Sequence, residues 1–277
     1  GSVKFHLDKY WSFKVRLKDS NILGLSEFAL MHPKRRNYLL EWYARKLFKY
    51  VGLIYKDYKF VNLYINGENK GLYAMDENYT ENLSTKNNRK EGLYLRYSSD
   101  ICFNDTINYA KNCWPENYLK STRIDLLNQN SFLKNDIQIK YLKNAEKKLD
   151  LLRNNKISPE FIFDLELFAK AFALSDLLGA WHSMGWANMK FYFNPFTNLL
   201  EPVVEDNYNE NTVYPTIDRL LRISDAVNYN QIYRVLFENK IFMEKYIFFL
   251  NLYSSEDYLK KFNTHIKKEF DKNLKSI

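Results

Sequence analysis

The amino-acid sequence predicts an α+β fold with a strand-rich N-terminal part and a helix-rich C-terminal part. Apolar and polar residues alternate in several segments of the first hundred residues, which is the period of a strand with one buried face. From about residue 137 the apolar residues recur at the three- and four-residue steps of helices. With 277 residues, 46% of them hydrophobic, the chain can fill the core of one large domain or two closely packed lobes.

The first two elements are a strand and a helix. Residues 13–17 alternate between apolar and basic side chains, which predicts a strand with one buried face. Residues 34–51 follow a proline and place apolar side chains at three- and four-residue steps, which predicts an amphipathic helix. Gly52 supplies a common C-terminal signal for that helix.

A hairpin and a further strand complete the first hundred residues. Residues 58–65 and 71–75 are rich in strand-forming residues, and Asn66-Gly67 between them is a dipeptide that tolerates positive φ. Residues 92–97 predict another short strand. We therefore expect these segments to form one antiparallel sheet with one helix inserted.

The second half begins with a polar excursion and a buried helix. Residues 98–135 are polar and rich in asparagine, which indicates a long excursion or a substrate-side insertion. Residues 161–178 are too apolar for a surface helix, and Ser158 and Pro159 before them are typical of an N-cap and a first helical position. We expect this helix to be central.

A second hairpin is predicted at residues 189–194 and 199–204, with Pro195 in its turn. Three further helices are expected at 216–237, 239–252 and 255–274. The predicted organisation is an expression scar at 1–2, a β-rich lobe at 3–100, a polar insertion at 101–135, and a helical lobe with the second hairpin at 136–277.

Charge and composition exclude several classes. The 41 Lys and Arg against 33 Asp and Glu give a net charge of +8, which favours an anionic partner without identifying it. Much of the lysine lies beside glutamate on predicted helix faces, and zinc-finger and RNA-binding signatures are absent, so nucleic acid is disfavoured. No apolar run has the roughly 20 residues that cross a bilayer, and no glycine-rich phosphate loop is present.

The cysteines and the N-terminus leave questions open. Cys102 and Cys113 lie in one polar stretch and can form a disulfide or remain free thiols, depending on the compartment. The four histidines are scattered, which disfavours a structural zinc site. Because Gly1-Ser2 is typical of an expression scar, the sequence does not determine the targeting signal.

The chemistry is predicted at the ends of the second hairpin. Because a hairpin brings its two ends together, Asn188 and Asp206 should lie near each other. An asparagine and an aspartate are suitable oxygen ligands for a Mg²⁺ that takes its remaining ligands from nucleotide phosphates and water. The alternative is that both side chains only cap turns at strand ends.

Several motifs resemble those of the CotH-type atypical kinases, the spore-coat kinase family. They are WSFKVRLK at 11–18, PKRR at 33–36, FVNLYING at 60–67, GLYAMDE at 71–77, NMKFYFNP at 188–195 and LEPVVED at 200–206. The resemblance covers roughly residues 11–210. It implies a divergent protein-kinase-like fold with a β-rich N-lobe, a helical C-lobe and ATP between them. It further implies Mg²⁺ or Mn²⁺, a hydroxyl acceptor on a protein or glycan, and an extracytoplasmic or cell-envelope location.

The resemblance also implies roles for individual residues. Asp206 matches the metal-binding aspartate, Asn188 the catalytic-loop asparagine, and Glu77 the N-lobe glutamate. The nucleotide-contacting lysine is replaced by Arg96, whose planar guanidinium is not equivalent to an ammonium group.

The catalytic aspartate expected five or six positions before Asn188 is missing. His182 and Ser183 stand there instead. His182 can accept a proton at neutral pH and is the first candidate base, with Asp176 on the preceding helix as the second. Each has a structural alternative, a histidine bonded to backbone and a carboxylate at a helix end.

Three other features are candidates for the same site. Trp181 can stack on adenine or belong to the core. Glu205 can be a second metal ligand or an exposed charge at a strand end. The basic run Lys34-Arg35-Arg36 at the start of a predicted helix opposes the helix dipole, which favours a role in binding a phosphate or another anionic partner.

Three functions follow from these observations. The first is metal-dependent phosphotransfer from ATP to a protein or glycan hydroxyl. The second is a pseudokinase, a nucleotide-binding scaffold favoured by the missing aspartate. The third is a non-enzymatic basic adaptor for an anionic polymer, favoured by the net charge of +8 and the asparagine-rich insertion.

Overall fold

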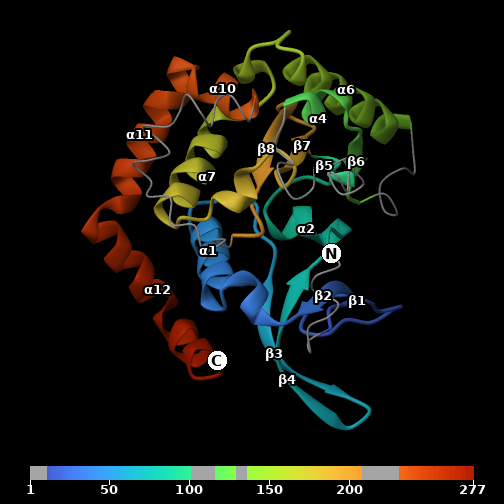
Figure 1. The fold of residues 1–277 in the computed structure, drawn as a ribbon, viewed down its shortest axis with the longest axis vertical. Coiled ribbons are helices and arrows are strands. Elements are labelled where there is room, and N and C mark those ends of the chain that lie inside the picture. Colours follow the sequence, from blue (N-terminus) through green and yellow to red (C-terminus); the bar gives the residue numbers. More distant parts are fainter. Residues whose placement is uncertain (1–10, 101–115, 129–135, 208–230) are drawn as a thin grey trace.

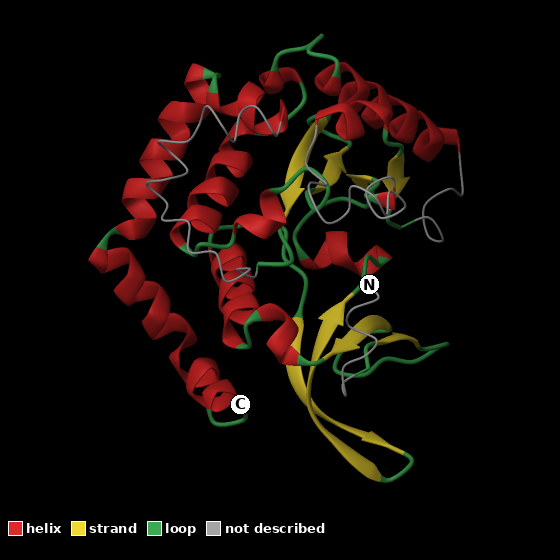
Figure 2. Ribbon diagram, viewed as in Figure 1, coloured by secondary structure: helices red, strands yellow, loops and turns green. Residues whose placement is uncertain are grey.

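The computed structural model describes residues 11–100, 116–128, 136–207 and 231–277. It confirms the α+β class, because two four-stranded antiparallel sheets combine with helices that lie mostly in the second half (Figure 1). Figure 2 shows the helices along one side of the molecule and over the second sheet. Within the described ranges, no helix is both long enough and apolar enough to cross a membrane.

The first sheet comes entirely from the first 80 residues. Its strands are β1 (Phe13–Arg16), β2 (Glu27–Met31), β3 (Tyr58–Ile65) and β4 (Glu68–Glu77), in the order β1-β2-β4-β3. The predicted hairpin is confirmed as β3 and β4, whose far end projects away from the rest of the chain (Figure 1). Asn66 and Gly67 have φ of 51° and 84°, the pair of positive values that a tight two-residue hairpin turn requires.

The helix predicted at 34–51 is interrupted. A 3₁₀ turn, η2 (Pro33–Arg36), precedes helix α1 (Leu39–Tyr50). Between them Asn37 and Tyr38 adopt φ of 51° and 52°. The amide of Asn37 donates to the carbonyl of Lys34, and that of Tyr38 to Pro33, so the 3₁₀ turn closes on itself before α1 begins. Side-chain periodicity does not reveal such a break, because it arises in the backbone.

The second sheet joins segments from both halves of the chain. Its strands are β5 (Leu93–Tyr97), β6 (Ile124–Leu126), β7 (Lys190–Asn194) and β8 (Leu199–Val203), in the order β6-β5-β7-β8. The prediction that β5 belongs to the first sheet is wrong, since it pairs with β6 and β7. Periodicity identifies a strand but not its partner, and here the partner lies about 100 residues away in sequence.

Helices α6 and α7 pack on one face of the second sheet. Helix α7 (Leu165–Leu177) is central as predicted, but Asp164 caps it instead of Ser158, and residues 159–161 form a separate 3₁₀ turn, η3 (Pro159–Phe161). The cap is decided by the Asp164 carboxylate, which accepts from the Leu167 amide at 3.0 Å. The other helices are α2 (Glu81–Lys86), α4 (Glu116–Ser121), α6 (Asp136–Arg153), α10 (Gln231–Phe237), α11 (Lys240–Ser254) and α12 (Glu256–Leu274).

The two faces of the second sheet have different environments. Leu95 and Phe191 belong to the main core, which also includes the apolar residues of α6 and α7. Tyr94 and Tyr192 face the other way and pack in a smaller cluster with Leu83 of α2. Because side chains alternate along a strand, every second residue of β5 and β7 faces away from the main core.

Some predictions lie outside the described residues. These are the scar at 1–2, Cys102 and Cys113, most of the insertion at 101–135, of which α4 and β6 are described, and residues 216–230 of the helix predicted at 216–237, of which α10 is described. The proposed lobe boundaries remain a prediction.

Gly92 provides a test of the packing at the start of β5. A Cβ there would lie 2.8 Å from the carbonyl oxygen of Phe193 and against the ring of Tyr192. We expect Gly92→Ala to lower the free energy of unfolding by about 1–3 kcal/mol, as overpacking typically does. Urea denaturation measures this change in the free energy of unfolding. The neighbouring exposed variant Glu91→Ala should stay within about 0.5 kcal/mol of wild type, and equal stability of both variants would contradict the packing.

Candidate functional site

A polar row crosses the second sheet on the face turned away from the main core. Arg96 on β5 is the register partner of Lys190 on β7 and of Asp125 on β6. Partners in an antiparallel sheet point to the same side, so the three side chains lie next to one another. The Arg96 guanidinium donates to the Asp125 carboxylate at 3.2 Å. The row leads from the β6 edge of the sheet toward the end of β8.

The predicted metal and base residues lie at the end of this row. Asn188 precedes β7, and its side-chain amide lies 3.1 Å from Nε2 of His182 in the 3₁₀ turn η4 (Trp181–Met184). Asp206 follows β8 and pairs with Arg36 of η2. Burial raises the pKa of Asp206, but Arg36, Lys190 and His182 lower it more, so it lies below its ordinary value. His182 therefore contacts Asn188 and is near enough to lower the pKa of Asp206.

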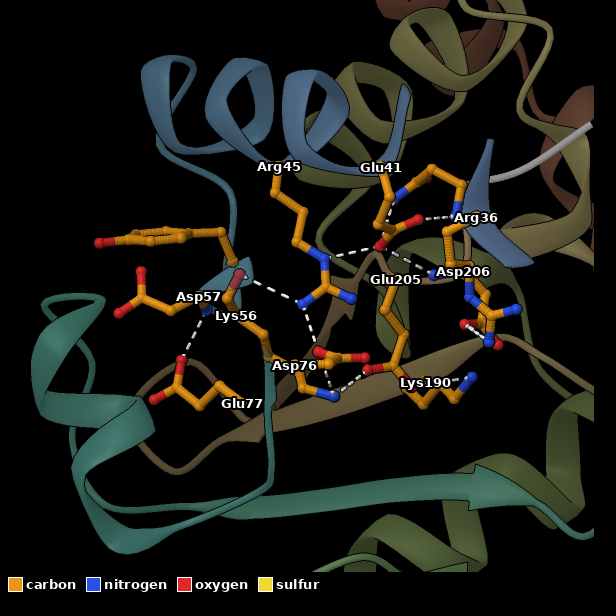
Figure 3. Close-up of polar contacts among 12 residues, drawn as sticks. Arg36, Glu41, Arg45, Lys56, Asp57, Asp76, Glu77, Lys190, Glu205 and Asp206 are labelled. Atoms are coloured by element: carbon orange, nitrogen blue, oxygen red, sulfur yellow. Dashed lines mark hydrogen bonds and ion pairs between the residues drawn. The ribbon is translucent and has the colours of Figure 1, made fainter. Parts of the chain in front are cut away.

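Glu205 is held by two lysines. It forms ion pairs with Lys56, which precedes β3, and with Lys190 at 3.1 Å (Figure 3). Burial alone would raise its pKa, but the two ammonium groups hold that pKa well below the ordinary value. Its side chain is 11% exposed, so the alternative of an exposed strand-end charge is wrong.

A chain of buried charges continues from Glu205 to helix α1. Lys56 lies 3.7 Å from Asp76 at the end of β4, and Asp76 binds Arg45 of α1 at 2.7 Å. Arg45 in turn binds Glu41, one helical turn earlier, at 2.6 Å. Figure 3 shows these side chains in one continuous group. Together with the Arg36 and Asp206 pair, this group contains four cations and four carboxylates. The cations are Arg36, Arg45, Lys56 and Lys190, and the carboxylates are Glu41, Asp76, Glu205 and Asp206.

Glu41 also fixes the backbone that carries Asp206. Its carboxylate accepts the amide of Asp206 at 3.2 Å and the amide of Asn207. Asp206 has φ of 64°, a left-handed conformation that aspartate and asparagine tolerate better than most residues. Helix α1 thus holds the Asp206 backbone in an uncommon conformation.

The other predicted residues lie in separate surroundings. Asp176 is buried in α7 and accepts from the Tyr246 hydroxyl of α11 at 2.7 Å. Glu77 at the end of β4 accepts from the Asp57 amide at 2.7 Å and from Lys86. Trp181 begins η4, and its side chain lies outside the described part of the structure.

A polar cleft of about 630 Å³ lies where the two sheets meet. Its basic side chains are Arg96 of the polar row together with Lys14, Arg16 and Arg123, and its acidic ones are Glu27 and Asp125. Tyr79 also lines it, and burial together with the Glu205 carboxylate raises the pKa of that tyrosine. Of the polar row, Arg96 and Asp125 line this cleft.

Sequence reasoning missed much of the site. Glu41 belongs to the helix covered by the family resemblance, but the resemblance assigns it no role. Its i, i+4 spacing from Arg45 could have suggested an ion pair. Lys190 stands between apolar residues in a hairpin strand, a signal of a buried partner. Asp76 lies in the GLYAMDE motif without an assigned role, and Lys56 carries no comparable signal. Only the tertiary structure brings the two side chains together.

The donor set for a metal is small. In the described part of the chain, no group of three or more His, Cys, Asp and Glu side chains is arranged to hold a metal ion. Asn188 and Asp206 offer an amide oxygen and a carboxylate, hard oxygen donors of the kind that Mg²⁺ and Mn²⁺ accept.

Comparison with known proteins decides the family. Residues 1–272, nearly the whole chain, match the family described as CotH kinase protein. The chain belongs to the CotH kinase family. No curated protein matches this sequence. The resemblance predicted from the motifs is thus confirmed, and membership of the CotH family indicates a kinase-like activity.

The buried role of Glu41 can be tested by removing its charge. Glu41→Gln leaves Arg45 without one carboxylate and weakens the bonds to the Asp206 and Asn207 amides. We expect a loss of about 3–5 kcal/mol in the free energy of unfolding, as for other broken buried pairs. The matched control is Glu244→Gln in the exposed Lys240 pair, expected to cost about 0.5 kcal/mol or less. Equal losses of unfolding free energy for the two variants, measured by urea denaturation, would contradict the buried role of Glu41.

The lowered carboxylate pKa values predict an acid-labile fold. Glu205 and Asp206 have folded-state pKa values below their ordinary ones. Their contribution to the free energy of unfolding is therefore fully present above an unfolded pKa of about 4. It is lost as the pH falls below that value toward the folded pKa. We expect the urea midpoint to change little between pH 7 and 5 from these groups and to fall at pH 3. A midpoint that stays constant down to pH 3 would contradict this.

Proposed function

We propose that this protein catalyses ATP- and divalent-metal-dependent phosphotransfer to a hydroxyl of a protein or glycan. The single observation that supports it most is the grouping of Asn188, His182 and Asp206 at the end of a row that contains Lys190. The CotH family match adds the kinase-like class. In this proposal the fold is a divergent two-lobed kinase fold, with ATP bound between a β-rich and a helical lobe.

Asn188 and Asp206 are the proposed metal ligands. A bound Mg²⁺ or Mn²⁺ would supply charge neutralisation for the nucleotide phosphates. Glu205 is less suited to be a second metal ligand, because Lys56 and Lys190 already share its carboxylate. We propose that it positions Lys190 beside Asp206.

Arg96 and Lys190 are the proposed phosphate-binding cations. They lie side by side on the sheet face that leads from the cleft to Asp206. Asp125 orients the Arg96 guanidinium, and Glu205 orients the Lys190 ammonium group. A polyphosphate along this row would contact the Arg96 and Lys190 cations, which would position it without a glycine-rich loop. Glu77, bonded to the Asp57 amide and Lys86, would support the sheet behind the nucleotide.

His182 is the proposed base for the acceptor hydroxyl. Its Nε2 is shared with the Asn188 amide, so the imidazole is oriented toward the proposed metal ligands. A neutral imidazole at that position can accept the proton of an incoming hydroxyl. Asp176 is less suited, because it is buried in contact with Tyr246 of α11.

A pseudokinase is the second candidate. The segment from residue 177 to Asn188 contains no carboxylate, so the usual base is absent. In that case the same site would bind ATP and metal without transferring phosphate. An anionic acceptor and a cell-envelope location remain parts of the proposal that rest on the net charge of +8 and on the family resemblance.

Asp206→Asn tests the metal site with little change in shape. Asparagine tolerates the positive φ of this position, so the backbone should be retained. We expect ATP affinity in the presence of Mn²⁺ to fall about tenfold or more, and ADP release to fall about 100-fold. Isothermal titration and a coupled ADP assay measure these quantities.

Asp271→Asn, in an exposed pair with Lys267, is the matched control and should leave both quantities unchanged. If the wild-type protein binds ATP with metal but releases no ADP, the protein is a pseudokinase. Wild type that binds no ATP with Mg²⁺ or Mn²⁺ excludes both nucleotide-dependent functions and favours a basic adaptor.

A further inference from the structure

The basic turn before α1 contacts the proposed metal ligand directly. Arg36 of η2 forms an ion pair with the Oδ1 atom of Asp206. The two side chains are 19% and 21% exposed, so the pair is largely shielded from water. A guanidinium group therefore holds one of the carboxylate oxygens that the proposed function assigns to a divalent metal.

A metal ion and the Arg36 guanidinium cannot both be the close counter-ion of that oxygen. Two cations at such short separation repel each other strongly in a partly buried site. Binding of metal at Asp206 therefore requires Arg36 to withdraw or to find an anionic partner of its own. Phosphate oxygens of a bound nucleotide would lie next to the metal, and arginine binds phosphate well because its planar fork can donate two hydrogen bonds.

An uncommon backbone conformation directly follows Arg36. Asn37 and Tyr38, which follow Arg36 directly, have φ of 51° and 52°. Tyr38 also has ψ of −106°, an uncommon conformation for a bulky residue and therefore a strained one. This strained joint separates Arg36 on η2 from Glu41 on α1 (Figure 3).

Glu41 keeps Asp206 in place independently of Arg36. Glu41 bonds the backbone amides of Asp206 and Asn207, whereas Arg36 pairs with the side-chain carboxylate of Asp206. Release of Arg36 thus frees the metal-binding oxygen and leaves the Asp206 backbone fixed.

We propose that Arg36 is an exchangeable counter-ion, an inference that rests on the proposed function. Arg36 pairs with Asp206 in the metal-free protein and moves to the phosphates when nucleotide and metal bind. Arg36 is then a positioning residue that couples the metal and nucleotide sites. It suppresses binding of metal alone, because free metal offers Arg36 no replacement anion. It favours binding of metal together with ATP, because the phosphates provide one.

The test compares Arg36→Gln with Lys261→Gln, which removes one cation from an exposed ion pair with Asp257 on α12. Isothermal titration uses three probes: Mn²⁺ alone, ATP with EDTA, and ATP with Mn²⁺. We expect Arg36→Gln to bind Mn²⁺ alone about tenfold more tightly than wild type and ATP with Mn²⁺ about tenfold more weakly. Lys261→Gln should match wild type with all three probes. A purely structural role for Arg36 would not move the two affinities in opposite directions.

Unchanged Mn²⁺ affinity in a folded Arg36→Gln variant overturns the exchange, and so does unchanged affinity for ATP with Mn²⁺. Arg36→Lys is the second variant if the first does not fold. It keeps the competing charge and loses the fork, so it should bind Mn²⁺ as wild type does and ATP with Mn²⁺ severalfold more weakly; equal ATP binding overturns the proposal. Failure of the proposed function is distinguishable, because wild type would then bind no ATP with Mn²⁺ while the Mn²⁺ arm still reports on Arg36.

Discussion

The buried carboxylate of Glu41 lies where helix α1, the end of β8 and the chain of buried charges meet. It bonds Arg45 on its own helix and the amides of Asp206 and Asn207 from the far half of the sequence. A buried carboxylate is costly unless all its neighbours are arranged to satisfy it. That requirement fixes the position of α1 relative to the second sheet, and the site residues on both elements depend on it.

Charge balance explains how so many ionisable groups share one interior region. Lys56 and Lys190 offset Glu205, Arg45 offsets Asp76 and Glu41, and Arg36 offsets Asp206. Such a balanced chain contributes little net stability compared with apolar packing, but removing one member leaves another charge buried without its partner. The chain is thus better suited to fixing the geometry of the site than to stabilising the fold. It also leaves the Arg36 and Asp206 pair as its most exposed part.

The second sheet is the element that connects the two halves of the protein. Its inward face shares the main core with α6 and α7, and its other face carries Tyr94, Tyr192 and the polar row. The alternation of side chains along β5 and β7 therefore places the core residues on one face of the sheet and the residues of the candidate site on the other. This arrangement holds Arg96 and Lys190 rigidly, since the strands that carry them are anchored in the core.

The sequence by itself determined the α+β class, both hairpins, the central helix and the CotH family, because local periodicity, turn dipeptides and motifs are properties of neighbouring residues. It also predicts that Asn188 and Asp206 lie near each other, since a hairpin joins them. Only the tertiary structure decided the partner of β5, the break at Asn37 and Tyr38, and the burial of Glu205 between two lysines. Pairing between strands and ions distant in sequence depends on which surfaces meet in the folded chain. No local pattern records that choice.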